Sequence, residues 1–160
     1  MQNEYSIKHI VVPTDFSESA YVAIDHAADL AKKFGSEITL IHVLETGAYQ
    51  GIFSPSKKTD YNELEQAKER LQEDAHKLEK SSGINVSQEV VRGRIHEEIV
   101  RTADEVNADL IVMGTHGSSG WEEFFAGSNA FKVVTQTPCP ILTIQQNATK
   151  PNCDHIILPI

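Results

Sequence analysis

The stretch 114–134, GTHGSSGWEEFFAGSNAFKVV, has the residue types and spacing best suited to bind an anion. Two glycines separated by two residues are followed, after nine further residues, by Gly-Ser-Asn: Gly114, Gly117, Gly127, Ser128 and Asn129. Glycine lets a backbone N–H approach an anion without an intervening Cβ, and the first N–H groups of a helix have no partner within it. The spacing favours a phosphate cradle, and an ordinary structural loop is the alternative.

Five apolar runs rich in β-branched residues predict the strands that position this stretch, at 9–13, 37–44, 84–91, 108–114 and 140–145. Helical patterns separate them, at 17–34, 60–80, 94–106 and 128–136. Ser17 is a favourable N-cap, Gly35 a favourable C-terminal residue, and Asp60 with Glu63 fits a capping box. Most of the apolar runs are continuous rather than alternating, which indicates a sheet covered on both faces. We therefore expect an α/β fold with a doubly wound, five-stranded parallel sheet of the Rossmann-like kind.

The carboxyl ends of the strands form the ligand crevice in a sheet of this type. The segments that leave these ends are PTDFS at 13–17, HVLE at 42–45 and the glycine stretch, so we expect them to meet. Asp15 would then face a ligand, and the alternative is that it only caps the helix that follows. His116 is either a ligand contact or an ordinary loop residue.

Composition narrows the classes of partner. The 160 residues are 40% hydrophobic and 23% charged, as in an ordinary single-domain globular protein. A net charge of −9 and the absence of a basic run argue against nucleic acid. The cysteines, Cys139 and Cys153, fit neither a disulfide framework nor a zinc motif. With no apolar run of signal-peptide or membrane-helix length, we expect a cytoplasmic protein with no membrane partner.

The spacing G-2x-G-9x-G-[ST], with VPTDFS after the first strand and PCPIL before the last, closely resembles the universal stress protein family, in its ATP-binding branch. The resemblance extends over residues 6–145. It implies a five-stranded parallel sheet in the order 3-2-1-4-5 with helices on both faces. It also implies an ATP-binding sensor or regulator of the stress response, with Mg²⁺ carried by the nucleotide phosphates.

Transferred to this sequence, the resemblance implies the following binding positions: Pro13, Thr14, Asp15, Val43, Met113, Gly114, His116, Gly117, Gly127, Ser128 and Asn129. The first four would meet the adenine and ribose, with the valine acting through its backbone. The next three would lie beside the ribose and the phosphates. The last four would hold the phosphates.

Efficient phosphoryl transfer needs positive charge on the developing oxyanions, and the stretch 114–129 contains no Lys or Arg and no GxxxxGK[ST] motif. We therefore expect slow or absent hydrolysis, with a slow ATPase and a nucleotide-free scaffold as the alternatives. Arg92 and Arg94 follow the third strand and are expected on a solvated face rather than on a ligand. PTDFSES also lacks the SGGxDS-type loop of adenylating enzymes, and Asp15 stands without the acidic cluster of a receiver domain.

The last predicted strand, 140–145, should lie at an edge of the sheet, where an apolar strand invites pairing with another chain. The resemblance implies a homodimer through this strand.

The C-terminal segment DHIILPI, 154–160, repeats the pattern of KHIVVPTD, 8–15, after the turn-rich linker 147–152. This echo suggests a domain at 1–146, followed at 147–160 by a linker and the first strand of a truncated second repeat. A chance match or a single extra strand is the alternative.

Overall fold

The computed structural model describes residues 6–45, 57–114 and 135–147. Its elements along the chain are β1 (His9–Pro13), α1 (Glu18–Phe34), β2 (Glu37–Glu45), α2 (Lys57–Ser82), β3 (Val86–Gly93), α3 (Ile95–Glu105), β4 (Leu110–Gly114) and β5 (Ile141–Ile144). Their order is the one that the periodicity predicts. Of the helix expected at 128–136, Thr135 and Gln136 are helical, and the rest lies outside the described residues.

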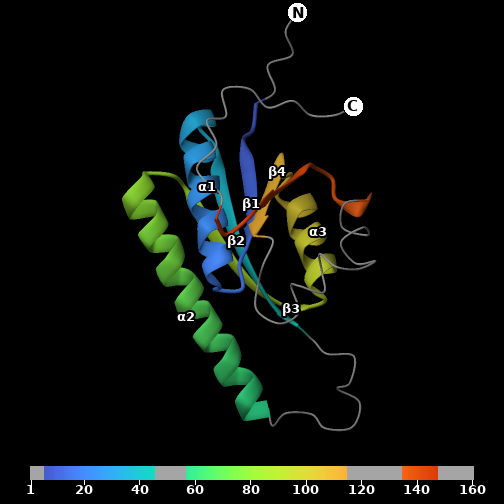
Figure 1. Cartoon of the computed structure of the whole chain (residues 1–160). Coiled ribbons are helices and arrows are strands. Elements are labelled where there is room, and N and C mark those ends of the chain that lie inside the picture. Colours follow the sequence, from blue (N-terminus) through green and yellow to red (C-terminus); the bar gives the residue numbers. More distant parts are fainter. Residues whose placement is uncertain (1–5, 46–56, 115–134, 148–160) are drawn as a thin grey trace, which may run out of the picture.

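The five strands form one sheet in the order β3-β2-β1-β4-β5, and all neighbouring pairs are parallel. Helices α1 and α2 cover one face of the sheet and α3 covers the other (Figure 1). The predicted doubly wound fold is therefore confirmed. Because the chain moves from β1 to one side through β2 and returns to the other side through β4, the winding direction reverses between β1 and β4.

The strands divide their side chains between two hydrophobic clusters, because successive residues of a strand point to opposite faces. On β1, Ile10 and Val12 pack under α1 and α2, whereas Val11 packs under α3. All three have no exposed surface. Burial on both faces explains the continuous apolar runs, since β1 is buried at every position after His9.

Helix α1 begins and ends as its sequence predicts. Ser17 is the N-cap, and its Oγ accepts a hydrogen bond from the backbone N–H of Ala20 at 3.2 Å. Gly35 adopts φ 70°, a left-handed conformation that glycine reaches without strain, and its N–H closes onto the carbonyl of Ala31.

Helix α2 begins earlier than the sequence predicts. The capping box expected at Asp60 and Glu63 is wrong, because the helix already starts at Lys57. The stripe of buried residues on this helix starts further along, at Ala67, and continues through Leu71, Ala75 and Leu78. The first turn of α2 therefore precedes the apolar periodicity, which does not indicate where the helix begins.

The α2 sequence is strongly polar outside that stripe. Among the residues that the structure describes, no helix combines the length and the apolar character needed to cross a bilayer.

Helix α3 is attached to β3 by a network centred on Arg101. The guanidinium donates to Glu98 at 2.8 Å, to Glu105 at 2.5 Å and to Glu89, on β3, at 3.2 Å. Glu89 also accepts from the hydroxyl of Thr102 at 3.1 Å. The carboxylates, chiefly Glu105, hold the pKa of Arg101 above its ordinary value. One cation therefore reduces the repulsion between carboxylates on two elements.

Replacing Arg101 with Met should lower the free energy of unfolding at pH 7 by about 1 kcal/mol, because the acidic side chains then face each other without their counter-charge. Part of the loss should be recovered in about 1 M NaCl, which screens the repulsion between the carboxylates. Urea denaturation at low and high salt measures both effects.

The control for this variant is Arg94→Met, since among the described residues Arg94 makes one ion pair, an exposed pair with Glu97. It should change the stability by less than half as much. Equal losses in the two variants would show that the network adds nothing beyond an ordinary surface pair.

Candidate functional site

Thr14 joins the carboxyl ends of β1 and β2. Its N–H donates to the carbonyl of Ile41 at 2.9 Å, and its own carbonyl accepts from His42 Nδ1 at 2.8 Å. Its Oγ1 accepts from the N–H of Phe16 at 3.1 Å. Thr14 is fully buried, so these bonds satisfy polar groups that water does not reach. The residue shapes the β1–α1 turn, and through its backbone it ties the turn to β2.

Asp15 lies in this turn and is partly buried. Its Oδ1 accepts a hydrogen bond from the N–H of Ser17 at 3.0 Å. The N-cap of α1 is Ser17, and Asp15 supports the start of the helix by bonding to the N–H of this N-cap. The carboxylate lies at the edge of the sheet where the winding direction reverses, and its contact with a ligand stays a prediction.

Phe16 carries the strain of the turn. Its φ of 63° is a left-handed conformation that a residue with a bulky side chain rarely adopts. The ring centroid lies 4.4 Å from that of His42 and 4.4 Å from the guanidinium carbon of Arg70. Arg70 comes from α2, and nothing in its helical spacing indicated that it reaches the ends of β1 and β2. Sequence reasoning missed Arg70 for this reason. It missed the role of Phe16 because the partners of its ring are distant in the chain.

His42 is held as a neutral ring with a defined tautomer. A carbonyl can only accept, so the hydrogen bond to Thr14 places the proton on Nδ1 and leaves Nε2 as an acceptor. Burial lowers the pKa of His42, and the positive charge of Arg70 lowers it further, while the Thr14 carbonyl and the carboxylates of Asp15 and Glu63 oppose the shift. At neutral pH the ring therefore offers an unprotonated nitrogen near the turn.

Val43 and Met113 can serve a ligand only through their backbones. Both side chains are buried in the cluster under α3, at 5% and 0% exposure. The predicted contact of Val43 with the base would therefore have to come from its main chain, and it stays a prediction. Pro13, the last residue of β1, is also buried and lies in register with Ile41 of β2.

Gly114 is required by packing. A Cβ at this position would lie 2.4 Å from Ser19 Oγ and 2.8 Å from the backbone oxygen of Ser19, in the first turn of α1. The close approach of α1 to the end of β4 thus depends on the missing side chain. The sequence pattern attributed this glycine to phosphate binding, and the structure gives it a packing role that applies with or without a ligand.

The remaining predicted contacts, His116, Gly117, Gly127, Ser128 and Asn129, lie outside the described residues. The phosphate half of the candidate site therefore stays a prediction. Arg94 is exposed and bonds to Glu97 on its own helix, and Arg92 is also exposed, as expected for a solvated face.

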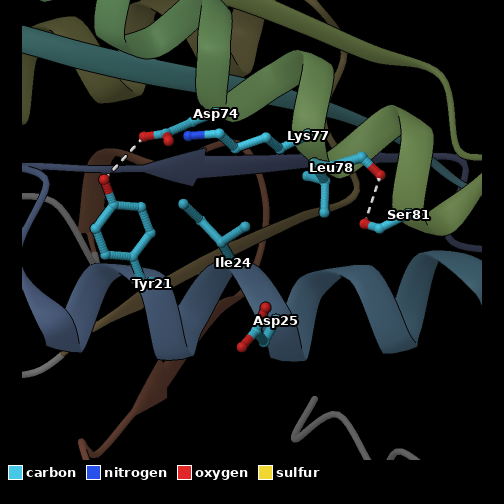
Figure 2. A pocket seen from close by; sticks show the side chains of 7 residues that line it. All are labelled: Tyr21, Ile24, Asp25, Asp74, Lys77, Leu78 and Ser81. Atoms are coloured by element: carbon cyan, nitrogen blue, oxygen red, sulfur yellow. Dashed lines mark hydrogen bonds between the residues drawn. The ribbon is translucent and has the colours of Figure 1, made fainter.

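A groove of about 430 Å³ runs between α1 and α2, away from the predicted contacts. Figure 2 shows Ile24 and Leu78 pointing toward each other from the two helices, with the Tyr21 hydroxyl donating to Asp74 Oδ2 at 3.0 Å. Burial raises the pKa of Tyr21, Arg70 opposes this effect and Asp74 adds to it. Arg70, which contacts Phe16, lies one helical turn before Asp74 on α2. The groove thus approaches the β1–α1 turn at its Tyr21 end.

Metal and thiol chemistry have no support in the part of the chain that the structure describes. No group of three or more His, Cys, Asp or Glu side chains there could hold a metal ion. Burial, with a smaller contribution from Asp109, raises the pKa of the Cys139 thiol to about 11, so this group is a poor nucleophile at neutral pH.

The strand order places this chain in the class of doubly wound α/β proteins. Proteins of this class bind ligands at the strand ends, at the point where the winding direction reverses. The sequence pattern of the universal stress protein family matches residues 6–145, and the chain belongs to that family.

Individual universal stress proteins are similar to this chain. Universal stress protein MJ0531 of Methanocaldococcus jannaschii is 35% identical over 142 residues, which cover 87% of this chain and 82% of the relative. Universal stress protein MJ0577 of the same organism is 30% identical over 155 residues, covering 87% and 95%. The solved structure of UspA from Lactobacillus plantarum has a TM-score of 0.71 at 25% identity and covers 88% of this chain and 99% of its own.

Two more distant structures were solved with ligands. A universal stress protein in complex with cAMP has 22% identity and a TM-score of 0.60, and one from Archaeoglobus fulgidus in complex with dAMP has 23% identity and a TM-score of 0.60. At this identity the likeness shows the shared fold.

Replacing Gly114 with Ala should lower the free energy of unfolding by roughly 1–3 kcal/mol, because the new Cβ overlaps with backbone atoms of Ser19 and forces α1 to move. Urea denaturation without ligand measures the loss.

Gly93→Ala is the comparison for this variant, since the atoms nearest to a Cβ at Gly93 belong to the side chain of Glu98, which can move at the cost of its bond to Arg101, whereas Gly114 faces backbone. If Gly114→Ala were as stable as the parent, α1 and β4 would not be packed as closely as the structure indicates.

His42 should make the stability depend on pH. Its folded-state pKa is lowered, so the contribution of the neutral ring is fully present above about pH 6.5 and is lost as the pH falls through the folded-state value. His42→Gln should therefore lose less stability than the parent between pH 7.5 and pH 5.5 in urea denaturation. His76→Gln, at an exposed position on α2, is the control and should follow the parent. Parallel curves for parent and His42→Gln would contradict the assignment.

Proposed function

We propose that this chain binds an adenine nucleotide, with ATP and Mg²⁺ as the first candidates, and acts as a sensor or regulator in the cytoplasmic stress response. The observation that carries the proposal is the β1–α1 turn. It holds the Asp15 carboxylate at the reversal point of the sheet, beside the buried ends of β1 and β2. Open α/β sheets bind their ligands at this point.

Ligands of other family members support the adenine assignment. The complexes with cAMP and dAMP concern proteins of the same fold, and both ligands share the adenine base. We propose that the backbone of Val43 and the acceptor nitrogen of His42 read the base in this chain. An adenine amino group donates hydrogen bonds, which suits such acceptors.

The glycine stretch supports the phosphate half of the proposal. Gly117, Gly127, Ser128 and Asn129 supply amide and hydroxyl donors but no positive charge, so a polyphosphate would depend on these donors and on its own Mg²⁺. This donor set suits binding better than phosphoryl transfer. We therefore propose hydrolysis that is slow or absent.

We also propose a homodimer through the edge strand β5. The side chains of Ile141 and Leu142 are partly buried, which leaves apolar surface beside an edge strand that is paired to β4 on one side. The division into a domain at 1–146 and a second repeat that begins within 147–160 stays a proposal, because residues 148–160 lie outside the described residues.

Calorimetric titration with ATP and Mg²⁺ tests the nucleotide proposal. The parent should bind, and a variant with Gly117→Val and Gly127→Val should lose at least tenfold in affinity for ATP, because side chains then block the approach of the phosphates. The affinity for adenosine should change little, which makes adenosine the internal control. These glycines are preferable to Gly114, whose substitution also disturbs packing.

Phosphate release under the same conditions should stay below about one turnover per second, the low end of typical enzymes. A folded parent that binds neither ATP nor adenosine would favour the nucleotide-free scaffold. Rapid turnover would favour the ATPase instead.

A further inference from the structure

Phe16 occupies an unfavourable backbone conformation that needs support from its surroundings. A left-handed φ of 63° in a residue with a bulky side chain persists only where neighbouring contacts compensate for it. Part of the support is local, since Thr14 Oγ1 accepts from the N–H of Phe16. The rest comes from elements far away in the chain, because the ring contacts His42 on β2 and Arg70 on α2.

Arg70 makes two contacts with Phe16. Its guanidinium carbon lies 4.4 Å from the ring centroid, within the range of a cation–π interaction. Its Nη2 also reaches the carbonyl oxygen of Phe16, in a long contact of 3.5 Å. A planar cation is suited to both contacts at once, because one part covers the ring while an N–H points to the backbone.

Asp15 is directly linked to this support. It precedes Phe16 in the same turn, and its Oδ1 is fixed by the N–H of Ser17. A change in the backbone of Phe16 would therefore rotate the peptide that carries Asp15 and move the N–H that holds its carboxylate. The contact between Arg70 and Phe16 thus constrains the residue that faces the proposed ligand.

We infer that Arg70 is a positioning residue for the nucleotide site: from α2, it holds Phe16 in the left-handed turn and thereby fixes the orientation of Asp15. The inference rests on the proposed function. In this role Arg70 acts through Phe16 and does not contact the phosphates, so its effect on affinity is the same for every ligand that uses Asp15. It also makes the site depend on the position of α2, a helix otherwise attached by the buried stripe of Leu71, Ala75 and Leu78.

The test compares Arg70→Gln with the parent by titration with adenosine, AMP, ADP and ATP. We expect Arg70→Gln to lose roughly three- to tenfold in affinity for each of the four ligands, the size of one cation–π contact. Arg70→Lys, which keeps the charge over the ring, should recover part of the loss. Lys68→Gln is the matched control, since it makes the same change of charge two residues away on the same helix and its partner is Glu65.

A double variant shows whether Arg70 acts through Phe16. Phe16→Gly removes the ring but accepts a positive φ without strain. In that background Arg70→Gln should cause a much smaller loss of affinity, because the ring contact is gone and only the long contact with the backbone carbonyl of residue 16 remains. The melting temperatures of Arg70→Gln and Lys68→Gln should agree within about 2 °C, which separates positioning from a general loss of stability.

Three results would overturn the inference. One is an Arg70→Gln protein that binds all four ligands as tightly as Lys68→Gln. Another is a loss that grows from adenosine to ATP and persists without the Phe16 ring, which would make Arg70 a direct phosphate contact. A parent that binds none of the four ligands would refute the proposed function together with this role, whereas the first two results leave nucleotide binding intact.

Discussion

The burial of β1 from Ile10 to Pro13 is the constraint on which the rest of the structure depends. Ile10, Val11 and Val12 have no exposed surface, because β2 and β4 pair with the strand on both sides and helices cover both faces. Backbone groups in such an environment must find partners within the protein. The chain can leave this interior only at the carboxyl end of the strand, and it does so through Thr14, whose N–H, carbonyl and hydroxyl oxygen are all bonded. The site begins where the buried strand ends.

Packing and the proposed binding share residues at this edge of the sheet. Gly114 ends β4 at a point where α1 comes so close that a Cβ would overlap with Ser19. The same approach brings the first turn of α1, the positive end of the helix dipole, beside the end of β4. A short distance between helix and sheet is therefore a requirement of the core and a condition for an anion-binding edge. A glycine pattern associated with ligands can have both causes at once.

The two faces of the sheet attach their helices in different ways. On one face, Arg101 connects α3 to β3 through several carboxylates, so this helix is held by charge as well as by Ile99 and Ala103. On the other face, α2 packs by a narrow apolar stripe, bonds to α1 through Asp74 and to β3 through Glu79, and reaches the β1–α1 turn through Arg70. Polar contacts thus support both helices, and α3 is held in addition by a cluster of ion pairs.

The sequence by itself determined the order of elements, the parallel sheet, the caps of α1 and the positions of Thr14, Asp15 and Val43 at strand ends. These features follow from local rules: continuous apolar runs indicate burial on both faces, and caps depend on residues a few positions apart. The start of α2 at Lys57 escaped prediction because a polar first turn carries no periodic signal. Only the tertiary structure decided that Gly114 is needed against Ser19, that His42 is neutral with its proton on Nδ1, and that Arg70 covers Phe16. The partners in these contacts lie far apart in the chain, and no local pattern records which side chains a fold brings together.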